Sequence, residues 1–153
     1  MKKGVKVLIA VAAFVIVSIA VVLLIVLPAT LNNAAKLQTY DLGADKIPSL
    51  NSIVGDRKVT GVSSSAKTGG VQEKTYTYET QSLGEDWLAY HNALHEAGFL
   101  VTRSLNGNDF KGDIQYGINS ADEGKAILID LSWDNTRIAV QITKGVGEIT
   151  PYD

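Results

Sequence analysis

The hydrophobic pattern of this chain begins with one long apolar run. Residues 7–27, "VLIAVAAFVIVSIAVVLLIVL", include a single polar side chain, Ser18. At about 1.5 Å per residue, a helix of this length spans roughly 31 Å, which matches the hydrocarbon layer of a bilayer. The pattern predicts a transmembrane helix over Val7–Leu27.

The charges on either side of this run predict its orientation. Lys2, Lys3 and Lys6 precede it, and no charged residue follows it until Lys36. The positive-inside bias then places the N-terminus in the cytoplasm and the rest of the chain outside. A cleaved signal peptide has a shorter apolar region, about 7 to 15 residues, and a small-residue cleavage pattern, which Asn33 interrupts here. We therefore expect an uncleaved, single-pass signal anchor, with residues 1–27 as cytoplasmic stub and span.

The pattern weakens after the run. Residues 28–54 have little periodicity and contain Pro, Asn, Gly and Ser, a mixture typical of a tether or lead-in. Ile47 and Leu50 offer apolar side chains that could pack a short segment onto a folded domain. We expect that extracytoplasmic domain to occupy residues 55–153.

Alternation with period two begins near Arg57. The stretches 57–65 and 71–80 are rich in Val, Thr and Tyr, and turn residues separate them, which predicts an antiparallel hairpin. Tyr76 and Tyr78 share one face of the second strand. They form a possible interaction surface, while cross-strand packing on a sheet face is the commoner use of such a pair.

The period then changes to that of a helix. Ser82 and Glu85 fit a capping box at its start, and Gly98 fits a left-handed cap at its end. Trp87, Tyr90 and Leu94 fall on one side of the helical wheel, which predicts an amphipathic helix lying on an apolar surface.

Alternation returns from residue 99 onward and is clearest over residues 113–119, 125–133 and 136–144. The predicted fold class is α+β: one N-terminal transmembrane helix, then a small domain of one antiparallel sheet with one main helix on one face, in the order β-β-α-β-β-β.

Two histidines lie four residues apart on the predicted helix, at the edge of its apolar stripe. His91 and His95, with Glu96 or Asp86, are the candidate ligands of a metal site or metal-dependent enzyme. A zinc site needs at least three protein ligands, and the H-E-x-x-H motif would need glutamate where Asn92 stands. We favour histidines at the edge of a core, and we expect no metal or other cofactor.

Composition excludes several classes of function. The chain has no cysteine, which removes disulfides, thiolate zinc sites and cysteine nucleophiles. Beyond the apolar run, 11 basic side chains face 16 acidic ones without a basic cluster, which speaks against nucleic acid. No phosphate-binding loop, dinucleotide-binding glycine pattern or nucleophile elbow is present. The excess of acidic over basic side chains favours a protein or a neutral ligand as partner.

The helix segment "AYHNALHEAGF", with Tyr90, Leu94, Gly98 and Phe99, stands between "DRKVTG…TYTYET" and "GINSADEGKAILIDLSW…TRIAVQITKG". Over residues 55–150 this arrangement resembles small uncharacterised envelope proteins of Gram-positive bacteria. The resemblance implies a membrane- or lipid-tethered extracytoplasmic domain without an assigned activity, and it transfers no functional residues. We expect a non-enzymatic, membrane-anchored domain with an interaction or accessory role at the cell envelope; the alternative is the metal-binding function of His91 and His95.

Overall fold

The structure, a computed structural model, describes residues 27–108 and 110–150. The described chain forms eight strands in two antiparallel sheets, together with three helices. The elements are α2 (Leu27–Ala35), β1 (Thr39–Leu42), β2 (Asp45–Pro48), α3 (Leu50–Val54), β3 (Lys58–Lys67), β4 (Val71–Glu79), α4 (Leu83–Glu96), β5 (Leu100–Gly107), β6 (Lys111–Asn119), β7 (Lys125–Asp134) and β8 (Arg137–Val146).

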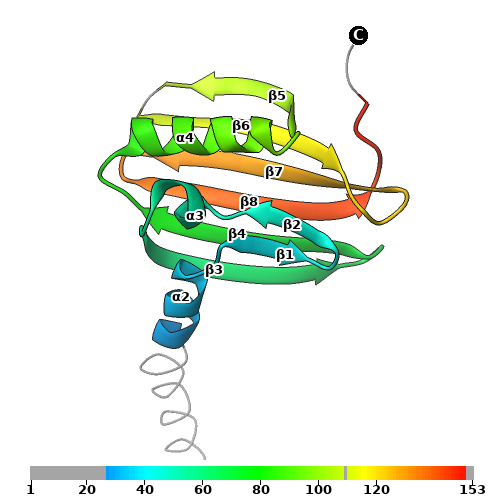
Figure 1. The fold of residues 1–153 in the computed structure, drawn as a ribbon, viewed down its shortest axis with the longest axis horizontal. Helices are drawn as coiled ribbons and strands as arrows, with labels where there is room; N and C mark the ends of the chain where they lie inside the picture. The colour runs from blue at the N-terminus through cyan, green and yellow to red at the C-terminus, as the bar shows by residue number, and fades with distance from the viewer. Residues whose placement is uncertain (1–26, 109, 151–153) are drawn as a thin grey trace, which may run out of the picture.

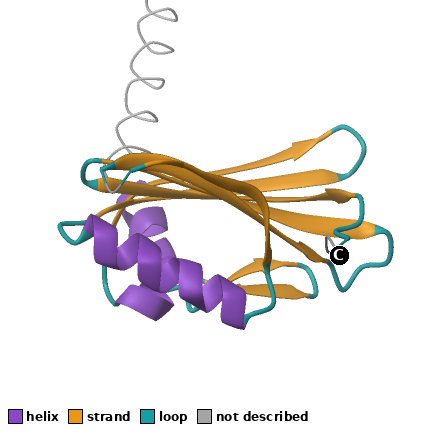
Figure 2. Ribbon diagram, turned by 90° about the horizontal axis from the view of Figure 1, so that it is seen from above, coloured by secondary structure: helices purple, strands orange, loops and turns teal. Residues whose placement is uncertain are grey.

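The larger sheet has six strands in the order β3-β4-β8-β7-β6-β5, and every neighbouring pair is antiparallel. Strands β1 and β2 form a separate two-stranded hairpin. Helices α3 and α4 and this hairpin all lie on one face of the larger sheet, and the described chain leaves most of the other face uncovered (Figures 1 and 2). We call the covered face the inner face and the other the outer face.

The predicted fold class was wrong in its architecture, although its α+β character is confirmed. The structure has two sheets instead of one, three helices instead of one main helix, and four strands after α4 instead of three. Residues 39–54, expected in the lead-in, form β1, β2 and α3. These elements are short, so their sequences carry too few turns or alternations for periodicity to reveal them.

The predicted membrane span, residues 7–27, lies outside the described residues except for Leu27, which begins α2. Within the described ranges, no helix is both long enough and apolar enough to cross a membrane.

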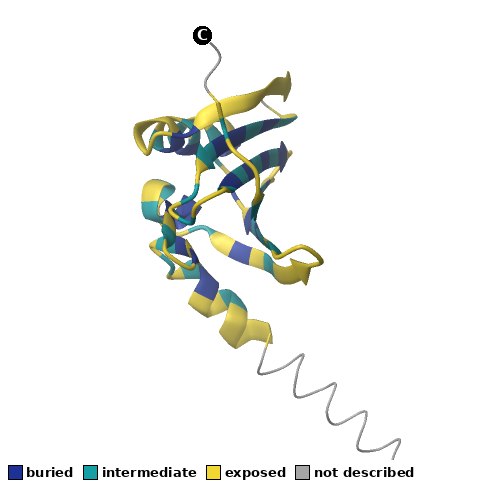
Figure 3. Ribbon diagram, turned by 90° about the vertical axis from the view of Figure 1, so that its right-hand side faces the viewer, coloured by how far each residue is buried: buried dark blue, intermediate teal, exposed yellow. Residues whose placement is uncertain are grey.

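The core lies between the inner face and the elements that cover it. Alternate residues of β6, β7 and β8 are buried, as expected for strands with one packed face. Figure 3 shows this alternation as bands along the strands. The largest fully buried side chains are Tyr40, Tyr78, Tyr90, Tyr116, Leu42, Ile47, Leu50, Leu94, Ile127, Ile129, Leu131 and Ile138.

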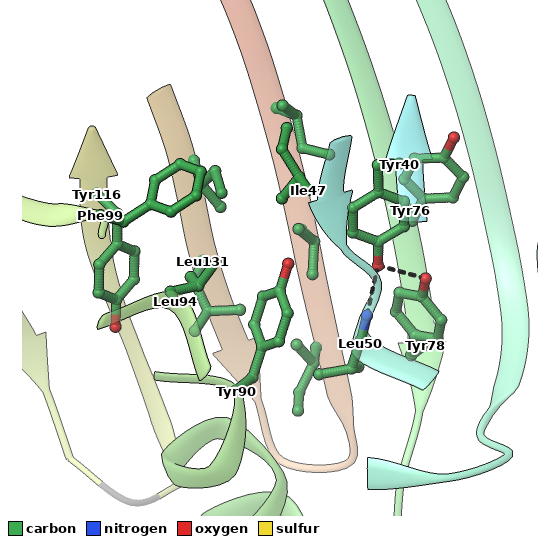
Figure 4. Close-up of a cluster of buried hydrophobic side chains, with 14 of the residues drawn as sticks. Tyr40, Ile47, Leu50, Tyr76, Tyr78, Tyr90, Leu94, Phe99, Tyr116 and Leu131 are labelled. Carbon is green, nitrogen blue, oxygen red and sulfur yellow. Dashed lines mark hydrogen bonds between the residues drawn. The ribbon is translucent and has the colours of Figure 1, made fainter. Parts of the chain in front are cut away.

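Buried tyrosines connect the hairpin to the larger sheet (Figure 4). The ring of Tyr40 stacks on that of Tyr76 at 4.4 Å, and the hydroxyl oxygens of Tyr40 and Tyr78 lie 2.5 Å apart. The backbone N–H of Leu50 donates to the Tyr40 hydroxyl at 3.0 Å. Burial raises the pKa of Tyr78 to about 12 and also raises that of Tyr40, so both phenols remain protonated and hydrogen-bonded at neutral pH.

Candidate functional site

The predicted histidines lie on the flank of α4 that faces β6. The rings of His91 and His95 contact each other edge to face at 4.5 Å, and Nδ1 of His91 lies 2.5 Å from the Tyr116 hydroxyl. Burial, with a smaller contribution from His95, lowers the pKa of His91. His91 therefore stays neutral at pH 7 and shares a hydrogen bond with the Tyr116 hydroxyl, whose direction depends on the tautomer of the imidazole.

This arrangement does not assemble the proposed metal ligands. Asp86 is engaged elsewhere, with Arg57, and Glu96 is an exposed residue at the end of α4. Among the residues that the structure describes, no group of three or more His, Asp or Glu side chains is placed to hold a metal ion. The third group beside the two histidines is the Tyr116 phenol, which hydrogen-bonds to His91 and packs against both imidazole rings.

The two tyrosines considered as an interaction surface are inside the molecule. Tyr76 is 6 % exposed and Tyr78 is fully buried, both on the inner face. The Tyr76 ring stacks on Tyr40 and the Tyr78 hydroxyl hydrogen-bonds to it, so in this structure the two tyrosines connect β4 to the β1–β2 hairpin.

Two buried charge clusters hold elements together. Arg57 donates to both carboxylate oxygens of Asp86, at 2.7 and 2.8 Å, and Thr80 also donates to Asp86. Lys144 on β8 donates to Asp45 at 2.6 Å and also contacts Asp122 at 2.8 Å. Because the buried Asp86 and Lys144 each have hydrogen-bonded partners of opposite charge, we assign both clusters a structural role.

The edge of the larger sheet at β3 is the surface best suited to bind another chain. From Gly61 to Lys67 the pairing of β3 with β4 is regular, and no described strand pairs with the other side of β3. Helix α2 packs against β3, near the beginning of the strand (Figure 1). The segment 63–67 is exposed, and residues 61–66 carry no charge and no proline. Its unpaired backbone N–H and C=O groups can accept a further strand.

A hollow of about 310 Å³ lies beside this edge on the inner face. It lies between β3 and β1. Nζ of Lys74, which lines the hollow, donates a hydrogen bond to the carbonyl oxygen of Asp41 on β1 at 2.7 Å. The remaining lining comes from Leu42, Gly43, Ser64, Ser65, Ala66 and Gln72. A strand added to β3 would direct every second side chain toward this hollow.

The opposite edge, β5, is built differently. All of its residues are exposed, but its pairing with β6 is irregular at two places, between Val101 and Arg103 and between Arg103 and Asn106. The Arg103 guanidinium also lies 2.9 Å from Asp130 and 3.0 Å from Asp113. Irregular pairing and a charged side chain are the usual protection of a sheet edge, and β3 has neither along residues 61–66.

A second, larger hollow lies on the outer face near the ends of β6, β7 and β8. It has a volume of about 670 Å³, and Ser132, Asp134 and Arg137 contribute to its polar lining. Small-molecule sites are typically enclosed and mostly apolar, with a few convergent polar groups. This hollow is open, and its lining mixes apolar surface with the polar side chains named above, so it lacks the enclosure typical of such sites.

Comparison with known proteins finds no matching family model, no similar curated protein and no similar solved structure. The resemblance to Gram-positive envelope proteins therefore stays a prediction.

Sequence reasoning identified β3 as a strand but not as an edge. The order of strands in a sheet depends on contacts between distant segments, and the alternation of apolar residues within one strand does not reveal it. One local signal was present: the run from Ser63 to Ala66 has no large apolar side chain on either face, which is unusual for a central strand.

Proposed function

We propose that this protein is a non-enzymatic interaction domain that binds an extended protein segment as an additional strand along β3. The observation that supports the proposal is the uncharged, exposed stretch from Ser63 to Ala66, which lies within the regular pairing of Gly61–Lys67 and next to the hollow between β3 and β1. Backbone hydrogen bonds supply affinity in this mode of recognition, and alternate side chains supply specificity.

The geometry favours a protein over a small ligand. The described hollows are open, and the one beside β3 is bordered by the β3 edge, which offers backbone hydrogen bonds to another backbone. The acidic balance of the chain, 16 acidic against 14 basic side chains, is compatible with a protein partner and unfavourable for nucleic acid.

We also propose that the domain acts on the extracytoplasmic side of the cell membrane. This location rests on the sequence alone, on the apolar residues 7–27 and the lysines that precede them. Protease treatment of intact cells that express the full chain tests it: digestion of the domain in intact cells supports the location, and protection until lysis contradicts it.

The strand-addition proposal is tested with a photo-crosslinking amino acid at position 65, in the full chain in its native membrane. We expect crosslinks to one identified protein segment, present in wild type and in Ser104→Lys, and lost in Ser64→Lys. Ser104 is an exposed residue of β5, so its substitution controls for added charge. Crosslinks that persist unchanged in Ser64→Lys would contradict the proposal.

A further inference from the structure

Strand β5, at the opposite edge of the larger sheet from β3, ends in an asparagine followed by a glycine, Asn106–Gly107. This is the only asparagine in the sequence that precedes a glycine. The backbone nitrogen of the residue after an asparagine can attack the asparagine side chain, and glycine obstructs that attack least because it has no Cβ. The reaction requires that this nitrogen is free of hydrogen bonds and that the side chain is loosely held.

The backbone N–H of Gly107 points away from the neighbouring strand β6. The carbonyl oxygen of Asn106 lies on the β6 side, 2.9 Å from where a Cβ on Gly112 would stand. In a trans peptide unit the C=O and the following N–H point in opposite directions, and the described peptide bonds are all trans. No described strand pairs with the far side of β5, so the Gly107 nitrogen faces the open edge of the sheet (Figure 1).

The Asn106 side chain is exposed and weakly held. Its Nδ2 lies 3.4 Å from Oδ1 of Asp113, which is longer than a typical N–H···O hydrogen bond. The pairing of β5 with β6 is irregular between Arg103 and Asn106, so the strand is poorly fixed just before this residue. Gly107, at φ +134°, has the conformational freedom that lets the peptide unit between residues 106 and 107 rotate toward the side chain.

We propose that Asn106 is a site of self-modification, at which the side-chain amide is converted to a carboxylate. The Gly107 nitrogen bonds to the side-chain carbonyl carbon of Asn106 and gives up its proton, and the amide nitrogen takes up that proton and leaves as ammonia. The resulting cyclic imide is opened by water, which is the only co-reactant, and no electrons are exchanged. Opening at the side-chain carbonyl gives aspartate, and opening at the main-chain carbonyl gives isoaspartate.

The conversion releases the end of β5 from β6. Either product places a carboxylate directly opposite Asp113, where the Asn106 amide had been a hydrogen-bond donor, and like charges at opposite positions destabilise a strand pair. Arg103 does not offset the new charge, because its guanidinium is already shared between Asp113 at 3.0 Å and Asp130 at 2.9 Å. Isoaspartate also lengthens the main chain within a paired strand, which disturbs the register.

Peptide mapping by mass spectrometry tests the modification directly. The full chain in detergent is incubated at mildly alkaline pH in water labelled with heavy oxygen, and Asn106 should lose its amide nitrogen and gain a labelled oxygen. Asn135 is the internal control, because it is also exposed and also donates to a carboxylate, that of Asp134, but precedes Thr136. It should stay unmodified in the same sample. An intact Asn106, or equal conversion of the two asparagines, would overturn the proposal.

A destabilised variant shows whether the folded chain is the form that reacts. Arg57→Ala removes the partner of the buried Asp86, far in the chain from β5, and its lower stability is checked by urea unfolding. The rate of Asn106 conversion should equal that of wild type, because the Gly107 nitrogen is already free in the folded state. A rate that rises in Arg57→Ala would show that the reaction requires unfolding, and would contradict the role of the β5 geometry.

The effect on β5 is tested with Asn106→Asp, which reproduces one product. Hydrogen exchange over residues 103–107 should be faster than in wild type, and adding Asp113→Asn should return it toward the wild-type rate by removing the opposed charge. Asn135→Asp adds the same charge in another turn and should leave β5 unchanged. Equal exchange in Asn106→Asp and wild type would overturn the release of β5. These outcomes do not involve β3, so they are independent of strand addition there.

Discussion

Nδ1 of His91 lies 2.5 Å from the hydroxyl oxygen of Tyr116, and this contact joins α4 to β6. Burial raises the pKa of Tyr116, so the phenol keeps its proton, and burial together with His95 lowers the pKa of His91. Both groups are therefore neutral at pH 7, and the tautomer of the imidazole decides which of them donates the hydrogen bond. The histidine pair at the centre of the metal hypothesis is part of the packing between helix and sheet.

This contact should make stability depend on pH. Because the folded-state pKa of His91 is lower than in the unfolded chain, the unfolded chain binds the proton first as the pH falls. The free energy of unfolding should decrease as the pH drops below about 6.5, the usual histidine value, and level off below the folded-state pKa. Urea unfolding followed between neutral and mildly acidic pH measures this slope.

The same measurement on two variants identifies the source of the slope. His91→Asn should flatten it, whereas His95→Asn should keep most of it, because burial is the larger cause of the His91 shift. An unchanged slope in His91→Asn would show that other groups set the acid sensitivity. Tyr116→Phe should cost about 1 kcal/mol at neutral pH because it removes the hydroxyl that hydrogen-bonds to His91.

Because Arg57 pairs with a buried carboxylate, Asp86, alanine substitution should cost far more stability at Arg57 than at the adjacent Lys58. Arg57→Ala leaves the Asp86 carboxylate, which is 3 % exposed, without its bidentate partner. We expect a loss of about 3 kcal/mol in the free energy of unfolding, the lower end of the range for breaking a buried pair. Lys58→Ala removes an exposed partner of Glu79 and should change stability little. Chemical unfolding of both variants compares them, and equal losses would refute the argument.

Much of the fold was accessible from periodicity. The alternation over 71–80, 113–119, 125–133 and 136–144 corresponds to β4, β6, β7 and β8, and Gly98, at φ +88°, ends α4 as predicted. The start of α4 differs in detail. Ser82 makes no side-chain cap, and Thr80 instead accepts from the Ser82 backbone N–H. Local sequence placed the boundary but not the side chain that stabilises it.

The parts that sequence could not supply depend on long-range contacts. Tyr40 looked like a residue of a tether, and its burial comes from Tyr76 and Tyr78, more than thirty positions away. One signal was available: Lys144 continues the buried positions Ile138, Val140 and Ile142 of β8. A lysine in a core-facing position requires acidic partners, and the structure supplies them as Asp45 of the hairpin and Asp122.

The Lys144 cluster predicts coupling between β8 and the β1–β2 hairpin. Lys144 donates to Asp45 and to the carbonyl oxygen of Leu42, so Lys144→Gln removes the charge that compensates Asp45. We expect faster hydrogen exchange across residues 39–48, with little change in β6. Lys125→Gln, which removes a longer and more exposed contact with Asp122, is the control. If hydrogen exchange in the hairpin did not change, the Lys144 cluster would not be what holds the hairpin to β8.

The two aspartates in this cluster should also make the folded state less stable at acidic pH. Burial alone would raise the pKa of Asp45, but hydrogen bonds from the Ala121 backbone, Lys144 and Ser120 outweigh it and lower the pKa. The pKa of Asp122 is also lowered, mainly by Lys144. Their contribution to stability is complete above the usual aspartate pKa of about 3.9 and is lost as the pH falls through the folded-state values. In Lys144→Gln this acid-dependent loss should be smaller, as measured by unfolding below about pH 5.

Two glycines give opposite predictions for the same substitution. A Cβ on Gly112 would lie 2.6 Å from a ring carbon of Trp133 and 2.9 Å from the carbonyl oxygen of Asn106, whereas a Cβ on Gly84, in the first turn of α4, would meet nothing within 4 Å. Gly112→Ala should lower the free energy of unfolding by about 1–3 kcal/mol, because the backbone oxygen cannot move aside cheaply. Gly84→Ala should raise it by about 0.5–1 kcal/mol through helix propensity and reduced unfolded-state entropy.

The tryptophans report on the same substitution. Trp133 stacks on Trp87 with centroids 4.9 Å apart and an interplanar angle of 1°, and these are the only two tryptophans in the chain. Displacement of the Trp133 ring in Gly112→Ala should reduce the near-ultraviolet circular dichroism of the pair, while Gly84→Ala should leave it unchanged. A destabilised Gly112→Ala with an intact tryptophan signal would place the strain at the backbone carbonyl of Asn106, on β5, instead.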